Sequence, residues 1–196
     1  AHLARAIDTA IEVPIAGTFT PDDLADDLAD YYDRGSSPGI GAGTTGIAAV
    51  YRPMPGLWTG VNGIPGNGKS SWLDWYAHCL MLTEGWRFAI CSPENHPTHR
   101  HLSKLIRIHV GKPFHEGATE RMTRAEMEDA RAWFAGRVRF VAPHEDDRGG
   151  YSLDNVLDLC AAEIRRFGVK GVIIDPWNEL EHHRPPGVRE DEYIAQ

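Results

Sequence analysis

Along most of this chain, short apolar runs alternate with longer stretches in which apolar residues recur every three or four positions. Short runs bounded by turn residues are typical of buried strands, and the longer spacing is typical of amphipathic helices. Strands that alternate with helices form a mostly parallel sheet with helices on both faces, so the pattern predicts an α/β fold. The predicted strands are Leu57–Val61, Arg87–Cys91, Val138–Val141 and Gly171–Ile174.

Four predicted helices connect these strands, and their ends carry clear signals. Thr123-Arg124-Ala125-Glu126 fits a capping box, in which the threonine and glutamate side chains bind free backbone N–H groups. Ser152 is a second N-cap residue, and Gly111 and Gly168 stand where helices commonly end in a left-handed residue. The predicted helices span about residues 70–83, 98–110, 124–134 and 153–167.

The first 46 residues are predicted to form an arm that precedes a core of residues 47–196. Thr20-Pro21-Asp22-Asp23 supplies an N-cap, an N-terminal proline and two acidic residues, so a linker helix is predicted at about 21–34. Gly35–Gly46 is glycine-rich and is predicted to be a linker or loop. We expect the helix to bury its apolar face either on an adjacent subunit or on its own core. That face consists of Leu24, Leu28, Tyr31 and Tyr32.

Composition limits the class of protein. The 196 residues, 42% of them hydrophobic, are enough for one domain with a well-formed core. A net charge of −8 argues against a broad basic surface for duplex DNA, although it permits a narrow basic channel. Cys79, Cys91 and Cys160 are predicted to be buried thiols of a reducing compartment. The sequence contains no apolar stretch as long as a membrane span and no signal peptide, so no membrane partner is expected.

The strongest motif is a P-loop between the first predicted strand and the first predicted helix. It reads Gly63-Ile64-Pro65-Gly66-Asn67-Gly68-Lys69-Ser70 and is followed by Ser71. Such a loop turns backbone N–H groups toward a di- or triphosphate, and the helix that follows adds its positive dipole end. Lys69 is expected to reach the β- and γ-phosphates, and the Ser70 hydroxyl is expected to bind Mg²⁺.

Two acidic residues follow predicted strands, where sites of open parallel sheets lie. Asp175 ends the run Val172-Ile173-Ile174 and fits the Walker B arrangement, which holds Mg²⁺ directly or through water. Glu94 follows Pro93 and is expected to orient and deprotonate the attacking water. The alternatives are an Asx turn at Asp175 and a helix-capping role for Glu94. Glu179 is the next candidate for the catalytic acid.

Several segments resemble the Twinkle-like branch of replicative helicases, which is related to the DnaB family and to phage primase–helicases. The similar segments are Gly63–Asp74, Ser92–Asn95, Gly111–Phe114 and Ile173–Leu180, and the arm helix resembles the helix that joins a Toprim primase-type domain to the motor. The resemblance implies a RecA-like P-loop NTPase core. It implies that Lys69, Ser70 and Asp175 bind nucleotide and Mg²⁺ and that Glu94 is catalytic. Gly46–Tyr51 departs from the family's pattern, so no residue is assigned to the base.

The same resemblance implies a motor that hydrolyses ATP or dTTP, works as a hexameric ring and moves on single-stranded DNA during replication. A primase or Toprim domain is expected upstream, and His182, His183 and Arg184 are candidates for DNA contact or for solvated charge. The expected compartment is the bacterial or phage-infected cytoplasm, or the mitochondrion of a eukaryote. The alternatives are another RecA-type ATPase, such as a recombinase or regulatory ATPase, and a truncated interaction fragment without turnover.

The chain also looks incomplete toward its C-terminal end. The family's next strand, which inserts between the P-loop strand and the Walker B strand, and its arginine finger are both missing before Gln196. We therefore expect a gap in the sheet, weak nucleotide binding, poor stability and no unwinding by these residues alone.

Two other groups of residues invite functional interpretations. His96, His99 and His101 lack the spacing of a zinc site and are expected to be exposed imidazoles at a helix N-terminus. Trp72, Trp75 and Tyr76 have the flat rings that stack on bases, but their helix predicts packing against the sheet instead.

Overall fold

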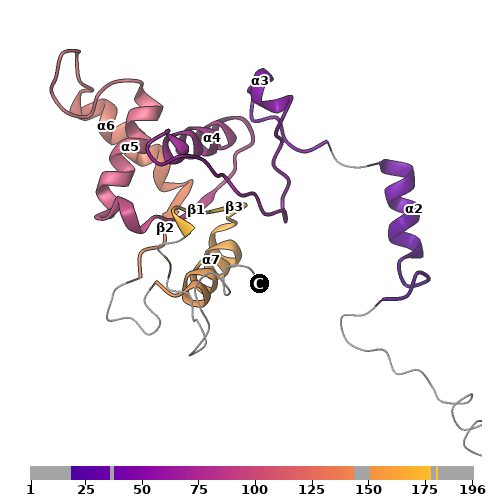
Figure 1. Ribbon diagram of the computed structural model, residues 1–196. Helices are drawn as coiled ribbons and strands as arrows, with labels where there is room; N and C mark the ends of the chain where they lie inside the picture. Colours follow the sequence, from indigo (N-terminus) through magenta and orange to yellow (C-terminus); the bar gives the residue numbers. More distant parts are fainter. Residues whose placement is uncertain (1–18, 36–37, 144–150, 178–179, 181–196) are drawn as a thin grey trace, which may run out of the picture. The chain divides into compact units, whose positions relative to one another are not determined.

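The computed structural model describes residues 19–35, 38–143, 151–177 and 180, which divide into two units (Figure 1). The first unit ends at Pro38, and the second begins at Gly39. The second unit therefore includes the last part of the predicted linker. Ala42, from that part, is only 1% exposed and belongs to the core of the second unit.

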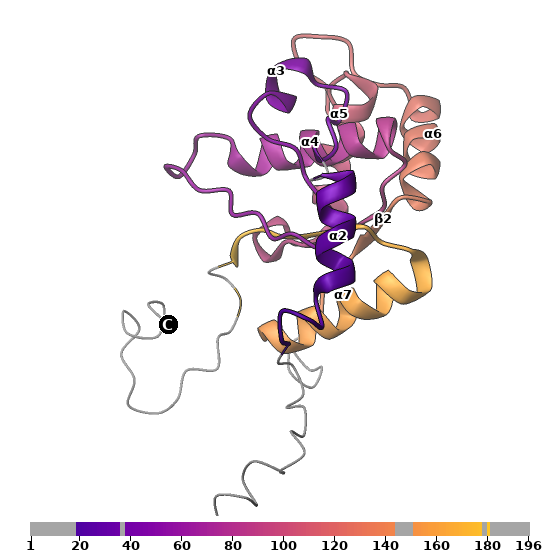
Figure 2. The same cartoon turned by 90° about the vertical axis from the view of Figure 1, so that its right-hand side faces the viewer.

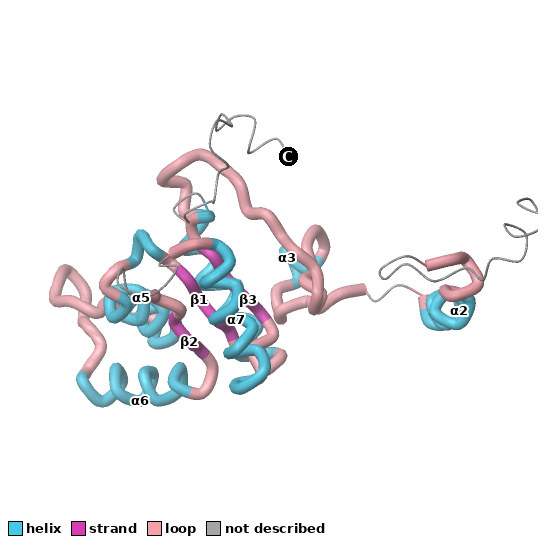
Figure 3. The backbone as a smooth tube through the Cα atoms, turned by 90° about the horizontal axis from the view of Figure 1, so that it is seen from below, coloured by secondary structure: helices cyan, strands magenta, loops and turns pink. Residues whose placement is uncertain are grey.

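A parallel sheet of three strands forms the centre of the second unit. The strands are β1 (Phe88–Cys91), β2 (Val138–Phe140) and β3 (Gly171–Ile174), and their order is β2-β1-β3. β1 pairs in parallel with both neighbours, and Ile90 stands opposite Phe140 on one side and Ile173 on the other. Figure 3 shows the three strands side by side with β1 in the middle. The predicted α/β fold with a parallel sheet is confirmed.

Helices cover both faces of this sheet. On one face, α4 (Lys69–Thr83), α5 (Thr98–Val110) and α6 (Arg124–Ala135) share a hydrophobic core with Phe88, Ile90 and Ile173. On the other face, α7 (Leu153–Phe167) packs against Ala89 and Cys91. Alternate residues of β1 thus point to opposite layers, as the pleat requires. Figure 2 shows α4 and α7 on opposite sides of the strands.

The predicted helix ends are largely confirmed. Thr123 and Glu126 make a reciprocal capping box at the start of α6. The Ser152 hydroxyl accepts a hydrogen bond from the backbone N–H of Asn155 at the start of α7. Gly111 and Gly168 end α5 and α7 with positive φ angles of 74° and 69°. These caps form because each satisfies backbone groups that the helix itself leaves free.

The predicted strand Leu57–Val61 is wrong, because these residues form no strand in the structure. Leu57 is 64% exposed and Trp58 is 86% exposed. β3 is an edge of the sheet among the described residues, and the extended segment is not paired with it. An apolar run forms a strand only where a neighbouring strand accepts its hydrogen bonds. The gap expected between Leu57–Val61 and Gly171–Ile174 stays a prediction.

The described part of the first unit is dominated by α2 (Ala25–Arg34), the predicted linker helix, which begins a few residues later than expected. In the turn before it, Thr20 and Asp23 exchange side-chain and backbone hydrogen bonds. The residues of its apolar face are all exposed, namely Leu24, Leu28, Tyr31 and Tyr32. Docking of this face on another subunit stays a prediction. In the second unit, a short helix α3 (Thr45–Ala48) follows the linker.

Among the described residues, no helix combines the length and the apolar character needed to cross a bilayer.

Candidate functional site

The P-loop lies directly before α4, as predicted. Gly66 and Gly68 both have a φ angle of 81°, a conformation that side chains with a Cβ rarely adopt. Gly68 is the N-cap of α4, and no side chain caps the first turn of this helix. The first N–H groups of a helix have no partner within the helix, so an uncapped first turn beside a glycine loop suits an anion.

The side chain of Lys69 folds back over the loop. Its Nζ donates to the backbone oxygens of Gly63, at 2.9 Å, and Ile64, at 3.2 Å. These carbonyl groups are the nearest acceptors in the loop, and they hold the ammonium group above the turn. A phosphate group carries more negative charge than a carbonyl oxygen and would compete for the same ammonium group.

Asp175 stands at the carboxyl end of β3 and is joined to the end of β1 through its backbone. Its N–H donates to the Cys91 carbonyl at 3.0 Å. Its own carbonyl accepts a hydrogen bond from the Ser92 hydroxyl at 2.8 Å. These two bonds fix the position from which the Asp175 side chain projects.

Glu94 lies in the turn that follows β1. This turn is a short 3₁₀ helix, η1 (Pro93–Asn95), and Glu94 is exposed within it. The side chain of Asn95 donates to the Ser92 hydroxyl at 2.7 Å and accepts from Lys104 Nζ at 2.5 Å. The turn is therefore tied both to the end of β3, through Ser92, and to α5, through Lys104. Glu94 itself does not cap α5. The N-cap residue of that helix is Pro97, and no side chain makes a capping hydrogen bond there.

The N-terminal end of α4 and the carboxyl end of β3 lie on the same side of the second unit (Figure 2). The described structure thus places the P-loop, Glu94 and Asp175 at one edge of the sheet. This is the edge at which ligands of open parallel sheets bind.

The residues expected to hold Mg²⁺ fit that ion chemically. Mg²⁺ binds oxygen ligands, usually one or two from the protein beside water and phosphate oxygens. Ser70 supplies a half-buried hydroxyl in the first turn of α4, and Asp175 supplies a half-buried carboxylate. Among the described residues, no cluster of three or more His, Cys, Asp or Glu side chains is arranged to hold a metal without such extra ligands.

The three histidines near α5 differ from one another. His96 and His99 are exposed, as expected. His101 was expected to be exposed, and this is wrong, because it is 2% exposed and its Nε2 lies 2.8 Å from Asp74 Oδ1. Asp74 belongs to α4, so the partner of His101 is remote in the sequence. No local sequence pattern signals such a contact. The only weak sign is a charged residue, Asp74, among the apolar residues of α4.

The aromatic residues of α4 mostly pack inside the unit. Tyr76 is 3% exposed and stacks on Trp72 with ring centroids 5.1 Å apart. Tyr51 joins this group at 5.6 Å from the Tyr76 ring. The prediction that these rings pack rather than bind bases is confirmed for Tyr76 and Trp72. Trp75 differs, because it is 36% exposed.

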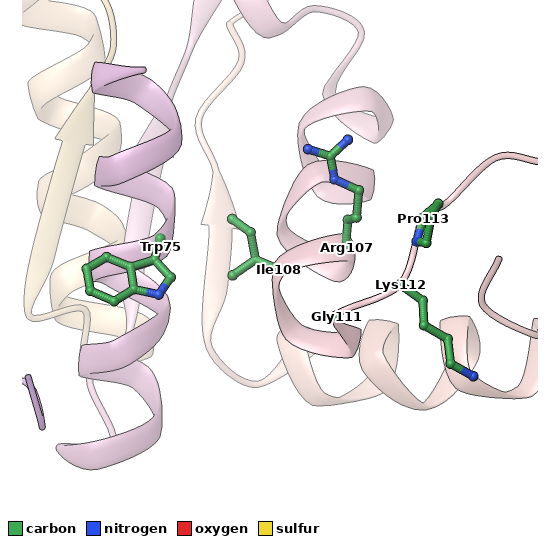
Figure 4. A pocket seen from close by; sticks show the side chains of 6 residues that line it. All are labelled: Trp75, Arg107, Ile108, Gly111, Lys112 and Pro113. Atoms are coloured by element: carbon green, nitrogen blue, oxygen red, sulfur yellow. The ribbon is translucent and has the colours of Figure 1, made fainter. Parts of the chain in front are cut away.

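Trp75 borders a groove that the sequence analysis missed. The groove has a volume of about 520 Å³ and lies between α4 and the end of α5 (Figure 4). Its lining residues are Trp75, Arg107, Ile108, Gly111, Lys112 and Pro113, none of which is a predicted nucleotide ligand. Lys112 is already engaged, since it donates to Glu126 at 2.7 Å and this bond lowers the pKa of Glu126 to about 2. The phosphate chemistry predicted from the sequence does not belong to this groove.

The cysteines behave as predicted for buried thiols at two of three positions. Cys91 and Cys160 are buried on opposite sides of the contact between β1 and α7, and Cys79 is half-buried. Burial raises the pKa of Cys91 to about 11 and also raises the pKa of Cys160. Thiols of this kind stay protonated and react slowly.

The remaining candidates lie outside the described residues. These are the alternative acid Glu179 and the proposed DNA contacts His182, His183 and Arg184. Their roles stay predictions.

Comparison with known proteins adds a relative to this geometry. The chain is 36% identical over 200 aligned positions to a protein of Arabidopsis thaliana named "Twinkle homolog protein, chloroplastic/mitochondrial". The chain is related to a Twinkle-type protein. The alignment covers 99% of this chain but 28% of that relative, so the chain spans less than a third of the relative's length. No family model matches the chain, and no solved structure matches it.

Proposed function

We propose that this chain is part of the motor of a Twinkle-type replicative DNA helicase, which hydrolyses ATP or dTTP to move on single-stranded DNA. The observation that carries this proposal is the P-loop before an uncapped α4, on the side of the unit where β1 and β3 end and are followed by Glu94 and Asp175. The relationship to the Arabidopsis Twinkle homolog supports a helicase over other RecA-type ATPases. It also argues against a fragment with no nucleotide chemistry.

In this proposal, different residues of the chain bind the phosphates, hold Mg²⁺ and accept the proton of the attacking water. The free N–H groups at the start of α4 and the Lys69 ammonium group bind the β- and γ-phosphates. Ser70 and Asp175 would hold Mg²⁺, which when bound would supply positive charge beside the phosphate oxygens. Glu94 accepts a proton from the attacking water, which it also orients. The Ser92 and Asn95 hydrogen bonds keep the Glu94 turn beside Asp175.

Assembly and partners belong to the same proposal. A hexameric ring around single-stranded DNA would place each nucleotide site next to another subunit, from which an arginine could reach the phosphates. An arginine supplied in this way raises phosphoryl-transfer rates by roughly 10³–10⁵-fold. We therefore propose that hydrolysis requires assembly, and that a Toprim or primase domain precedes the arm.

The decisive test replaces the lysine of the P-loop. We expect Lys69→Ala to abolish binding of Mg²⁺-nucleotide in calorimetry, because the lysine contacts the most highly charged phosphates. Lys170→Ala is the matched control, since Lys170 is an exposed lysine between α7 and β3. Unchanged affinity in Lys69→Ala would refute the P-loop assignment, as would equal losses in both variants.

A further inference from the structure

The most unusual polar contact in the second unit is the buried pair of Asp74 and His101. Asp74 is 5% exposed and His101 is 2% exposed, and the imidazole Nε2 lies 2.8 Å from the carboxylate Oδ1. Burying a carboxylate is costly unless a partner compensates for its lost hydration. Removing either member would leave the other buried and unsatisfied.

Each member of the pair stands close to one part of the proposed nucleotide site. Asp74 is on α4, a little more than one helical turn beyond Lys69 and Ser70. His101 is in the first turn of α5, which follows the turn that carries Glu94. The pair thus connects the helix that binds phosphate with the helix that follows the catalytic turn.

His101 also lines a small cavity, whose walls include polar residues and the apolar side chains of Ile90 and Phe140. Its volume is about 10 Å³, which is near the space that one water molecule occupies. Ser92, Asn95, His96 and Thr98 line it together with His101. The Nδ1 atom of His101 is buried and forms no hydrogen bond within the described residues. His101 therefore contacts the Asp74 carboxylate and also lines a cavity that Ser92, Asn95 and His96 of the Glu94 turn share.

The apolar contacts of α5 do not explain this arrangement. Leu105 and Ile106 are fully buried and already anchor the helix against the core. Apolar contacts tolerate small shifts of one helix along another, whereas a hydrogen bond fixes both distance and direction. A polar pair in this place therefore sets the position of the first turn of α5 relative to α4.

From these contacts we infer that Asp74 and His101 are positioning residues, which hold the Glu94 turn at a fixed place relative to the P-loop helix. This inference rests on the proposed function, because it assigns the pair to the same nucleotide site. Neither residue touches the nucleotide. Loss of their contact would lower turnover and leave nucleotide affinity nearly unchanged.

The test compares two conservative variants of His101 in the full-length protein. Glutamine can place an amide N–H near the position of Nε2, so His101→Gln keeps the donor to Asp74. Asparagine places its amide near the position of Nδ1, so His101→Asn loses that donor. Three quantities are measured for each variant: kcat for nucleotide hydrolysis, Kd for Mg²⁺-nucleotide, and hydrogen exchange of backbone amides without nucleotide.

We expect His101→Asn to lower kcat by about 10²-fold, the scale of a misplaced catalytic group, with Kd changed by less than about threefold. Amides of residues 94–96 should exchange about tenfold faster, while those of β1 and β3 are unchanged. His101→Gln should stay near the wild-type protein in all three measurements.

Three results would overturn the inference. In the first, His101→Asn changes neither kcat nor exchange. In the second, exchange rises equally in the turn and in β1 and β3, which would indicate a general loss of stability. In the third, the two variants behave alike. Failure of the wild-type protein to bind nucleotide would refute the proposed function instead, and the exchange comparison would still decide whether the pair positions the turn.

Discussion

The two halves of the proposed nucleotide site are held in different ways. Asp175 and Glu94 follow the paired strands β3 and β1, and backbone and hydroxyl hydrogen bonds link their positions. The P-loop follows residues 57–61, which are exposed and unpaired. On its other side the loop is continuous with α4, whose later turns are buried in the core. The loop is therefore anchored mainly by this helix, with one further hydrogen bond of 3.0 Å between Thr59 and the Tyr51 hydroxyl before it.

This difference separates elements that stabilise themselves from elements that need a neighbour. An amphipathic helix satisfies its own backbone and needs only a surface for its apolar face. A strand leaves its backbone groups free until another strand pairs with it. The carboxylate half is thus formed within the described residues, whereas residues 57–61 before the P-loop form no strand there.

The largest effect is expected from Glu94→Gln, which separates the chemistry of the carboxylate half from binding by the P-loop half. The substitution keeps the shape of the side chain and removes its basicity, so hydrolysis should fall by at least about 10²-fold. Nucleotide affinity should be retained. Turnover is measured in the assembled full-length protein, and binding is measured by calorimetry.

Glu84→Gln serves as the control for this substitution, because Glu84 is an exposed glutamate at the end of α4, away from the P-loop. Near-normal turnover of Glu94→Gln would move the catalytic role to another acid, with Glu179 as the first alternative. Loss of affinity would instead show that the two halves do not act separately.

The difference between the paired strands and residues 57–61 can also be tested by comparing how one alanine substitution in each changes the free energy of unfolding. Ile90→Ala in the central strand should lower the free energy of unfolding by about 2–5 kcal/mol, because Ile90 is 1% exposed. Leu57→Ala, in the unpaired segment, should change it by less than about 0.5 kcal/mol. Denaturant titration of both variants measures the difference. An equally large cost at Leu57 would mean that residues 57–61 are packed, and the contrast would be lost.

A smaller effect concerns the later turns of α4, which anchor the P-loop half. His78 is 7% exposed and its Nε2 lies 3.0 Å from Nδ1 of His109, with the rings of Trp133 and Phe134 around it. Burial, with a contribution from His109, lowers the pKa of His78 to about 4. Burial and the charge of Arg137 also lower the pKa of His109.

The sign of the pH effect follows from these directions. Between pH 6.5 and about 4 the unfolded chain binds a proton at His78 and the folded chain does not. The contribution of neutral His78 to the free energy of unfolding is therefore fully present above pH 6.5. It is lost as the pH falls from 6.5 toward 4. His78→Phe should therefore reduce the fall in melting temperature between pH 7 and pH 5 by a few degrees. His99→Gln, at an exposed position, is the matched control variant.

Sequence reasoning placed most elements because their signals are local. The capping box at Thr123 and the caps at Ser152 and Gly168 mark helix ends whatever the surrounding fold. The glycines and the lysine of the P-loop likewise form one continuous motif. Glu94 and Asp175 could be predicted to lie at the same edge of the sheet, because each follows a parallel strand and the carboxyl ends of parallel strands share one edge.

The missed features all depend on residues that are distant in the sequence. Residues 57–61 were predicted to form a strand, but a strand forms only where a neighbouring strand pairs with it. An apolar run in the sequence does not indicate whether such a neighbour is present. The burial of His101 depends on Asp74 of another helix. The groove beside Trp75 forms where α4 meets the end of α5. Each of these requires knowledge of how helices and strands pack together.

Hydrogen exchange of the wild-type chain, with and without a high concentration of Mg²⁺-nucleotide, tests the central contrast most directly. Without nucleotide, amides of β1 and β3 should exchange at least about tenfold more slowly than those of residues 57–68, because only the strands are paired. With nucleotide, amides of residues 63–70 should slow by about tenfold, while the strands change little. Slow exchange of residues 57–61 in the free chain would contradict the account, and so would a P-loop that is unaffected by nucleotide.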